Sequence, residues 1–413
     1  MAKDVLDVEF CRRFFPALKN GVAYFENAGG SYVPQQVVDR LQAYMSECQN
    51  QPAWAFRSSQ DATQRLEGAH RLFAEMIGAE RDEIVIGPST TLNVYILAQG
   101  LRPNFAPGDE IIVTNQDHEA NGGAWRRLEE FGIVVRQWSI DPVSGLLDLA
   151  ELDGLLNKKT RLLCFPHVSN VVGSINPVAE IAAKARRVGA LTCVDGVAYA
   201  AHGLIDVKDW DVDFYLFSLY KIYGPHLALM YGKREAIALC RNQNHYFHEN
   251  NPPETIHPGG LNYESVAALS GVGDYFDALY EHHFGGEAND PKTRLQAVFR
   301  LIEGHEGRCQ TRFLDYLRSR ADIRIIGDAS GDREKRMPTI SFSLDDWRSR
   351  DLAQGLADKD IAVGHGHFYG HRCVRALGYD DPEDGVVRVS MVHYTSLEEV
   401  DQLISAMDEL LSS

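Results

Sequence analysis

Residues 214–221 read FYLFSLYK and are followed at 223–225 by YGP. The run FYLF is apolar and rich in aromatic residues, which is typical of a strand buried on both faces of a sheet. Lys221 comes four residues after the end of this run. A lysine in such a place is usually a solvated loop charge, but a partly desolvated lysine has a lowered pKa and acts as a nucleophile. The stretch therefore predicts a buried strand that leads into a reactive lysine.

Apolar runs of this kind recur along the middle of the chain and alternate with helical patterns. The predicted strands are 83–86, 110–114, 134–138, 161–165, 191–194, 213–217 and 227–231. The predicted helices between them are 91–101, 124–131 and 178–188. This alternation predicts an α/β fold around a mainly parallel, seven-stranded sheet.

A second pattern begins near residue 275. It consists of a helix at 293–302, strands at 339–344, 361–363 and 386–391, and a final helix from Leu397. Helices and strands in this order predict a smaller α+β domain. We therefore expect a large domain over residues 21–275 and a small C-terminal domain over 276–413, joined by an N-terminal arm over 1–20.

Composition narrows the class of protein. The chain has 413 residues, 45% of them apolar, which is enough for a large core. Its formal net charge of -17 argues against a nucleic-acid partner, since phosphate binding needs a basic surface. No apolar run is long enough for a membrane span, and residues 1–10 lack a signal core. The seven cysteines are scattered singly, so we expect no disulfide framework, no metal site and a reducing, cytoplasmic location.

Polar residues follow five of the predicted strands. Ligands bind at the carboxyl ends of strands in an α/β sheet, so these residues are expected to share one pocket. They are Ser89-Thr90-Thr91, Asp117-His118, Ser169-Asn170, Asp195, and Ser218 with Lys221.

Two of these groups point to a cofactor. Asp195 ends an apolar run, and a buried carboxylate needs a cationic or hydrogen-bonding partner. In a pyridoxal 5'-phosphate (PLP) site the partner is the protonated pyridine nitrogen, whereas a turn or helix cap is the ordinary alternative. Ser89 and Thr90 open a helix, where hydroxyl and N–H groups bind a phosphate or simply cap the helix. Ser218 is able to add a hydroxyl to the same phosphate.

Arg388 lies inside the apolar run VVRVSM at 386–391. An arginine there needs an anionic partner. A substrate carboxylate gripped by two hydrogen bonds is one candidate, and a structural ion pair with one of the chain's many acids is the other.

Together these residues resemble the class V aminotransferase superfamily, of fold type I among PLP enzymes, and most closely its cysteine desulfurase-like branch. The resemblance covers nearly the whole chain, and it is the order and spacing of the segments that make it specific. The segments are YFENAG at 24–29, HVSNVVG at 167–173, VDG at 194–196 and SLYKIYGP at 218–225.

The resemblance implies PLP as the cofactor, held as a Schiff base by Lys221 with Asp195 at its pyridine nitrogen. It implies that His118 stacks on the cofactor ring. Further cofactor contacts are implied for Ser89, Thr90, Ser218 and Tyr220.

The resemblance also implies a place for the substrate. Asn170 and Arg388 match the groups that hold its carboxylate, and Asn27 is a further candidate for contact with it. Gly260 lies in PGGLN at 258–262, which is similar to a segment that a second subunit lends to the site. A homodimer with a shared active site is therefore expected.

Three positions depart from the family's desulfurases. Tyr369 falls where their nucleophilic cysteine lies, and the nearest thiol, Cys373, comes four residues later. Ala198 replaces a glutamine near the cofactor's phenolic oxygen. Tyr220 replaces the histidine before the lysine. The first departure argues against transfer of sulfur to the enzyme.

These observations predict a PLP-dependent amino-acid lyase that performs β- or γ-elimination, of the C–S lyase type, with a cysteine-derived substrate as the first to test. Lys221 would take the α-proton, and Tyr369, His367 or Tyr220 would assist the leaving group. A class V aminotransferase (a transferase) and an amino-acid epimerase are the alternatives. A true cysteine desulfurase and a non-catalytic PLP-binding protein are less favoured.

Overall fold

The computed structural model describes residues 5–249, 251–286 and 290–412. The arm predicted for residues 1–20 is therefore described from residue 5 onward, and its first four residues lie outside the described part.

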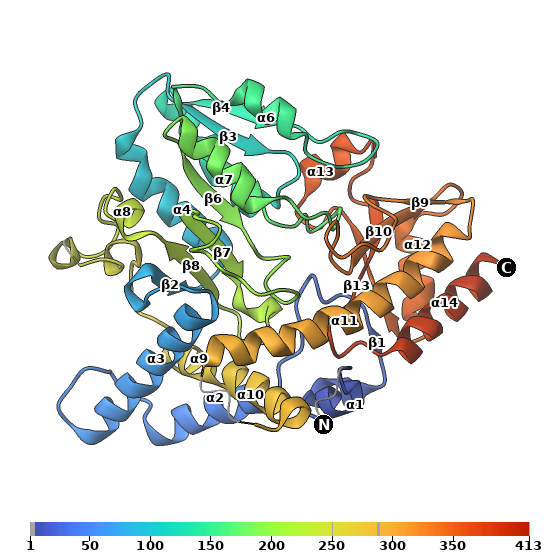
Figure 1. The fold of residues 1–413 in the computed structure, drawn as a ribbon, viewed down its shortest axis with the longest axis horizontal. Coiled ribbons are helices and arrows are strands. Elements are labelled where there is room, and N and C mark those ends of the chain that lie inside the picture. The colour runs from blue at the N-terminus through green and yellow to red at the C-terminus, as the bar shows by residue number, and fades with distance from the viewer. Residues whose placement is uncertain (1–4, 250, 287–289, 413) are drawn as a thin grey trace.

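A seven-stranded sheet forms the centre of the larger part of the molecule (Figure 1). Its strand order is β2-β8-β7-β6-β5-β3-β4, and only β8 runs against the others. The predicted α/β fold with a mainly parallel sheet is thus confirmed. The strands are β2 (Ile84–Gly87), β3 (Glu110–Thr114), β4 (Val134–Trp138), β5 (Thr160–Pro166), β6 (Leu191–Asp195), β7 (Phe214–Ser218) and β8 (Ala228–Gly232).

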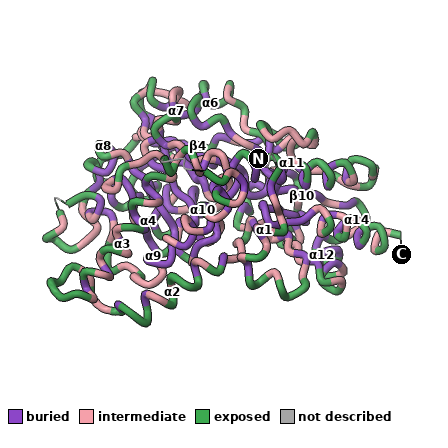
Figure 2. Tube along the Cα trace, turned by 60° about the horizontal axis from the view of Figure 1, so that its bottom comes forward, coloured by how far each residue is buried: buried purple, intermediate pink, exposed green. Residues whose placement is uncertain are grey.

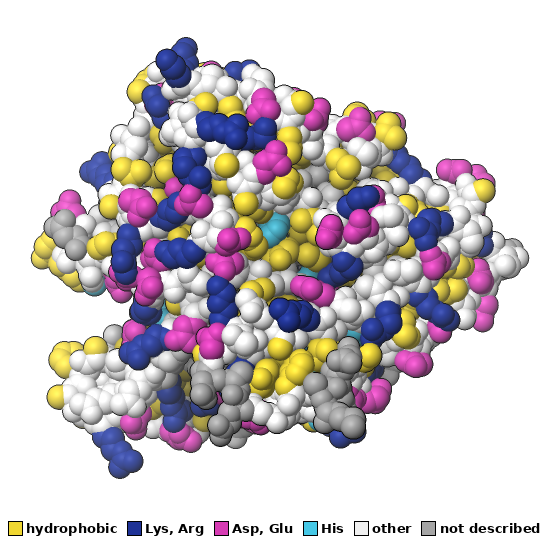
Figure 3. Space-filling view, in the orientation of Figure 1, with side chains coloured by type: hydrophobic (Ala, Val, Ile, Leu, Met, Phe, Trp, Pro, Cys, Tyr) yellow, Lys and Arg dark blue, Asp and Glu magenta, His cyan; other side chains and the backbone are white. Residues whose placement is uncertain are grey.

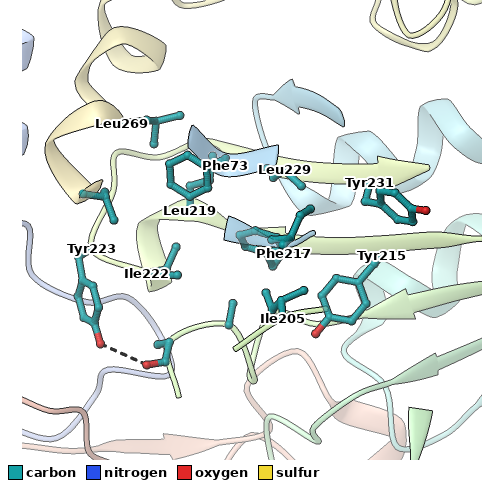
Figure 4. Close-up of a cluster of buried hydrophobic side chains, with 14 of the residues drawn as sticks. Phe73, Ile205, Tyr215, Phe217, Leu219, Ile222, Tyr223, Leu229, Tyr231 and Leu269 are labelled. Atoms are coloured by element: carbon teal, nitrogen blue, oxygen red, sulfur yellow. Dashed lines mark hydrogen bonds between the residues drawn. The ribbon is translucent and has the colours of Figure 1, made fainter. Parts of the chain in front are cut away.

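Strand β7 is buried on both faces, as its apolar sequence predicts. Phe214 and Leu216 point into one apolar core, while Tyr215 and Phe217 point into the other. Figure 4 shows Tyr215 and Phe217 among the packed side chains of that second core. The strand cannot shift by one residue without exchanging these two sets, so the position of Lys221 beyond its end is fixed.

Helices cover both faces of the sheet. Helices α4 and α5 contribute to the core that holds Leu216, and α3, α7 and α10 contribute to the core that holds Phe217. The helices of this part are α2 (Gln35–Glu47), α3 (Arg57–Met76), α4 (Thr90–Leu101), α5 (Glu119–Arg126), α6 (Leu149–Leu155), α7 (Val178–Arg187), α8 (Arg234–Ile237), α9 (Tyr263–Ala268) and α10 (Ser270–Phe284).

Helix α5 begins earlier than the helix predicted for 124–131, and residues 127–131 form a 3₁₀ helix instead. The reason is a cap: the His118 side chain accepts a hydrogen bond from the backbone N–H of Ala120 at 3.0 Å. Histidine is not among the usual capping residues, so the periodicity alone did not reveal this start.

The smaller part is built on a four-stranded sheet of order β12-β13-β10-β9, with a core of its own. The long helix α11 runs from the larger part to this one (Figure 1). The elements of the smaller part are α11 (Pro291–Arg318), β9 (Ile323–Ile325), β10 (Thr339–Leu344), α12 (Ser349–Ala357), β11 (Ile361–Ala362), β12 (Gly364–Gly366), α13 (His371–Ala376), β13 (Val386–Ser390) and α14 (Leu397–Leu411).

Two elements cross the boundaries that the sequence suggests for the domains. Helix α10 continues through residue 275, and its residues Tyr275 to Leu279 pack in the core of the larger part. The N-terminal strand β1 (Ala23–Tyr24), which follows α1 (Val8–Arg12), pairs with β11 of the smaller part. The beginning of the chain therefore contributes to both parts.

Figure 2 shows buried residues concentrated at the centre, with exposed residues along the outer helices. Basic and acidic side chains are interspersed on the face seen in Figure 3. Among the described residues, none of the helices has the length and apolar character that crossing a bilayer requires. The same part of the chain contains no group of three or more His, Cys, Asp or Glu side chains arranged to hold a metal ion.

Candidate active site

One pocket opens at the carboxyl ends of β2, β3, β5, β6 and β7, with about 500 Å³ of empty space. These strands are parallel, so the residues that follow them meet at one edge of the sheet. The pocket is lined by Ser89, Thr90, Thr91, His118, Ala120, Pro166, Val168, Asn170, Asp195, Val197, Ala198, Ser218, Tyr220 and Lys221. Each of the five groups that the sequence places after a strand contributes to this wall.

Lys221 ends the 3₁₀ turn that follows β7, and its ammonium Nζ lies 5.9 Å from the centre of the Tyr220 ring. Lys221 is partly buried and lines the pocket. Burial lowers the pKa of Lys221 to about 8, and the nearby Arg388 acts in the same direction. A substantial fraction of this amine is therefore neutral near pH 8, which is the form that attacks a carbonyl carbon.

Asp195 ends β6 on the pocket floor and accepts a hydrogen bond from the N–H of Val197 at 2.9 Å. Burial raises the pKa of Asp195 to about 6, although the hydrogen bond and Lys221 both favour the charged form. A cation placed against this buried carboxylate strongly stabilises its charged form. A protonated pyridine nitrogen is such a cation.

His118 caps α5, and burial lowers its pKa to about 3, so its ring is neutral. A neutral, flat ring in the pocket wall is suited to stack on another aromatic ring. The backbone of α5 and the cap together hold the imidazole in place.

A set of hydroxyls lies at the N-terminus of α4. The Ser89 side chain caps this helix by accepting from the N–H of Leu92 at 3.1 Å. The hydroxyls of Thr90 and Ser218 lie 2.8 Å apart, which joins the helix start to the end of β7. Hydroxyls and helix N–H groups are donors for a phosphate. Together with Asp195, His118 and Lys221, these donors fit the phosphate, ring nitrogen, ring face and carbonyl carbon of PLP.

Arg388 lies on β13, next to the pocket, and is almost fully buried. Its guanidinium pairs with Glu26, donates to the backbone oxygen of Asn170 at 3.1 Å, and lies 3.8 Å above the ring of Phe368. Asn170 lines the pocket, and its side-chain nitrogen donates to the backbone oxygen of Phe368 at 2.8 Å. Asn170 and Arg388, the two residues expected to bind the substrate carboxylate, are thus near the pocket, but Arg388 already has an anionic partner.

Asn27 is not among the residues that line the pocket, and its expected contact with the substrate stays a prediction. Its amide nitrogen donates to the backbone oxygens of Tyr24 and Ser390 at 3.1 and 2.9 Å. Its amide oxygen accepts from the hydroxyl of Tyr394 at 2.5 Å. The side chain is buried and fully hydrogen-bonded, so its role is to hold the N-terminal segment against β13.

The loop after β12 carries two of the three expected acids, Tyr369 and His367. Tyr369 is 70% exposed, and its ring centre lies 5.1 Å from that of His118, outside the pocket wall. His367 forms an ion pair with Glu383 at 3.3 Å. Neither side chain lines the pocket, whereas Tyr220 does. Tyr220 is therefore the best placed of the three expected acids.

The loop holding Tyr369 has an unusual backbone. Phe368 and Tyr369 have φ angles of 50° and 60°, in the left-handed region that favours glycine. The backbone oxygen of Tyr369 accepts from the N–H of Glu119 at 2.8 Å, and Asn170 holds the oxygen of Phe368. These bonds fix the loop beside the pocket in a conformation that its sequence does not suggest.

No thiol reaches the pocket. All seven cysteines lie in the described residues, and all are buried and unpaired. Cys373 packs among Val171, Val374 and Leu377, and burial raises its pKa to about 12. A buried thiol with such a pKa is inert as a nucleophile.

Two further residues were only partly visible from sequence. Gly260 lies in an exposed segment and does not line the pocket of its own chain. Glu26 is an acid inside the apolar and glycine-containing segment YFENAGG at 24–30, and this position is the signal in the sequence that points to it.

The chain is similar to proteins of one family along its whole length. The family described as aminotransferase class-V matches residues 23–279 and 295–403. The aminotransferase-like protein FGM3 of Gibberella zeae is 37% identical over 100% of both chains. The cysteine desulfurase-like protein ustD of Aspergillus flavus is 32% identical over 99% of this chain and 92% of its own. The apo structure of the cysteine desulfurase from Thermococcus onnurineus superposes with a TM-score of 0.86 at 26% identity, covering 100% of both chains.

Proposed function

The chain belongs to the class V aminotransferase family and is a PLP-dependent enzyme, and from this premise we propose that it is an amino-acid lyase of the β- or γ-elimination type. The proposal is supported by a pocket whose lining side chains suit PLP and whose wall contains no cysteine. A desulfurase needs a thiolate to accept sulfur, and an elimination needs only a base and an acid.

Each proposed role follows from a position in the pocket. When bound, PLP supplies an electron sink for the bonds at the substrate's α-carbon. Asp195 holds the proton at the ring nitrogen, and the hydroxyls of Ser89, Thr90 and Ser218 bind the phosphate. His118 supports the ring face. These residues keep the cofactor in one orientation relative to Lys221.

The remaining residues act on the substrate. Lys221 carries the α-proton on its Nζ, because its lowered pKa leaves the amine neutral near pH 8. Asn170 and Arg388 orient the carboxylate. The phenol of Tyr220, in the pocket wall, donates a proton to the departing group. Tyr369 and His367, which lie outside this wall, are the secondary candidates for that acid.

We also propose a homodimer with a shared site, in a reducing compartment such as the cytoplasm. The segment at 258–260 is exposed in a single chain, as are the large side chains of Trp54 and Tyr246, at 62% and 86%. Exposed apolar side chains of this size are typical of interaction surfaces. Seven unpaired cysteines fit a reducing compartment.

A product assay separates the candidate reactions. The purified holoenzyme is incubated with single amino acids, starting with L-cysteine and its thioethers, without a keto-acid acceptor. A lyase forms a keto acid and ammonia with no acceptor present. Product that depends on an added keto acid indicates an aminotransferase, and inversion at the α-carbon without product indicates an epimerase.

The same experiment includes two variants. Lys221→Ala should abolish turnover, and borohydride reduction of the wild type should place the cofactor on Lys221 in a peptide map. Lys184→Ala is the matched control, because Lys184 lies on α7, pairs with Asp153 and is not part of the pocket wall, so both results should be unchanged. Cofactor mapped to another lysine would contradict the assignment.

A further inference from the structure

Glu26 forms an ion pair with Arg388, the arginine that is proposed to bind the substrate. The carboxylate of Glu26 pairs with the guanidinium of Arg388. Of the two side chains, 27% of Glu26 is accessible to solvent but only 2% of Arg388. Glu26 is therefore the more exposed member of the pair.

The carboxylate of Glu26 lies in a cradle formed by two glycines. A Cβ atom on Gly29 would lie 2.6 Å from Oε1, and a Cβ atom on Gly364 would lie 2.6 Å from Oε2. Real side chains do not approach this closely. The space for this carboxylate therefore depends on two positions without side chains, one in the N-terminal segment and one on β12.

The hydrogen bonding around the pair is incomplete. Three buried atoms lack a partner among the described residues: Oε2 of Glu26, Nε of Arg388 and Oδ1 of Asn170. A permanent buried ion pair normally satisfies its remaining donors and acceptors, because an unpaired buried polar atom is costly. The cluster thus keeps a free donor and free acceptors beside the pocket.

The cluster also borders the pocket wall. The backbone oxygen of Asn170, a lining residue, accepts from Arg388. The backbone oxygen of Tyr220, another lining residue, accepts from the N–H of Ser31 at 3.0 Å, which ties the segment after Glu26 to the wall. The charges of both Arg388 and Glu26 act on the pKa of Lys221.

We infer that Glu26 is a positioning residue that holds Arg388 in the substrate-free enzyme and is displaced from it by the substrate's α-carboxylate. This inference rests on the proposed role of Arg388. The exchange replaces one anion by another, so the buried guanidinium is never left without a counter-charge. Its consequence is selectivity: an amine without a carboxylate cannot displace Glu26 and gains nothing from Arg388.

The test compares two probes on the holoenzyme, L-alanine and ethylamine, by the change in cofactor absorbance on titration. The wild type should bind L-alanine more tightly than ethylamine. In Glu26→Gln the competing charge is gone, so the affinity for L-alanine should rise about tenfold or more, the low end of the value of a hydrogen bond to a charged group. Affinity for ethylamine should stay within about twofold, because its binding does not involve Arg388.

Controls separate this inference from the proposed function. Glu409→Gln removes an exposed acid that pairs with Lys359 in the smaller part and should change neither affinity. If the wild type does not discriminate between the probes, the role of Arg388 is wrong. If it discriminates but Glu26→Gln gains no affinity for L-alanine, Glu26 is a structural partner and the displacement is refuted. If Glu26→Gln fails to fold, Glu26→Asp is tested instead, because aspartate is one methylene shorter than glutamate. This variant must also raise the affinity for L-alanine, or the inference fails.

Discussion

Replacing Cys373 by alanine tests whether a thiol takes part in the reaction. The side chain has no exposed surface and packs against Val171, Val374 and Leu377. Removing its sulfur leaves a small cavity, comparable to the loss of one buried methyl group. We expect the free energy of unfolding to fall by about 1 kcal/mol, with little effect on the pocket.

The effect on turnover follows from the protonation state of the thiol. Burial raises the pKa of Cys373 from 9.0 to about 12, so at pH 7.5 roughly one molecule in 30,000 carries the thiolate. A thiol with a pKa of 9.0 would be about 3% thiolate at the same pH. The burial thus reduces the reactive form about a thousandfold, equivalent to about 4 kcal/mol. Cys373→Ala should therefore keep its kcat within about twofold of the wild type.

The assay measures keto-acid formation, urea unfolding and protein-bound persulfide after incubation with L-cysteine, the last mapped by mass spectrometry. Cys309→Ala is the matched control, since Cys309 is equally buried and lies in the core of the smaller part. A persulfide on Cys373, together with an inactive but folded Cys373→Ala enzyme, would refute the elimination proposal. It would show that the loop opens and delivers a thiolate to the substrate.

Four further outcomes are expected. Asp195→Ala should still bind PLP but lose turnover by on the order of 100-fold or more, and a variant with the wild-type rate would assign the ring nitrogen to another group. Thr90→Val should raise the Kd for PLP about tenfold, the value of a hydrogen bond to a charged group, whereas an unchanged fluorescence titration would remove Thr90 from the phosphate site. Because burial lowers the pKa of Lys221 from 10.5 to about 8, the rate at which apo-enzyme takes up PLP should rise with a midpoint near pH 8; a midpoint near 10.5 would indicate a solvated lysine. Light scattering should give twice the chain mass for the active enzyme, and Gly260→Trp should lower both dimer content and activity, so an active monomer would contradict the shared site.

The sequence by itself determined the α/β fold, the approximate strands and the gathering of polar residues at one edge of the sheet. These features follow from local patterns: continuous apolar runs mark strands buried on both faces, and parallel strands bring the residues after them to the same side. Ser89, Thr90, Asp195, Ser218 and Lys221 line one pocket for this reason. The resemblance to the class V family, carried by the order of these same residues, supplied the cofactor.

The tertiary structure decided what depends on contacts between distant segments. Glu26 and Arg388 are separated by 362 residues, and they meet only because the N-terminal segment joins β11 and β13 of the smaller part. The same association places Asn27 where its side-chain amide is hydrogen-bonded to the Tyr394 hydroxyl and to the backbone oxygen of Ser390. The left-handed backbone at Tyr369 turns that side chain outward. No local pattern encodes these partners, because a side chain's hydrogen-bonding capacity is visible in the sequence but the groups that satisfy it are fixed only when the chain is packed.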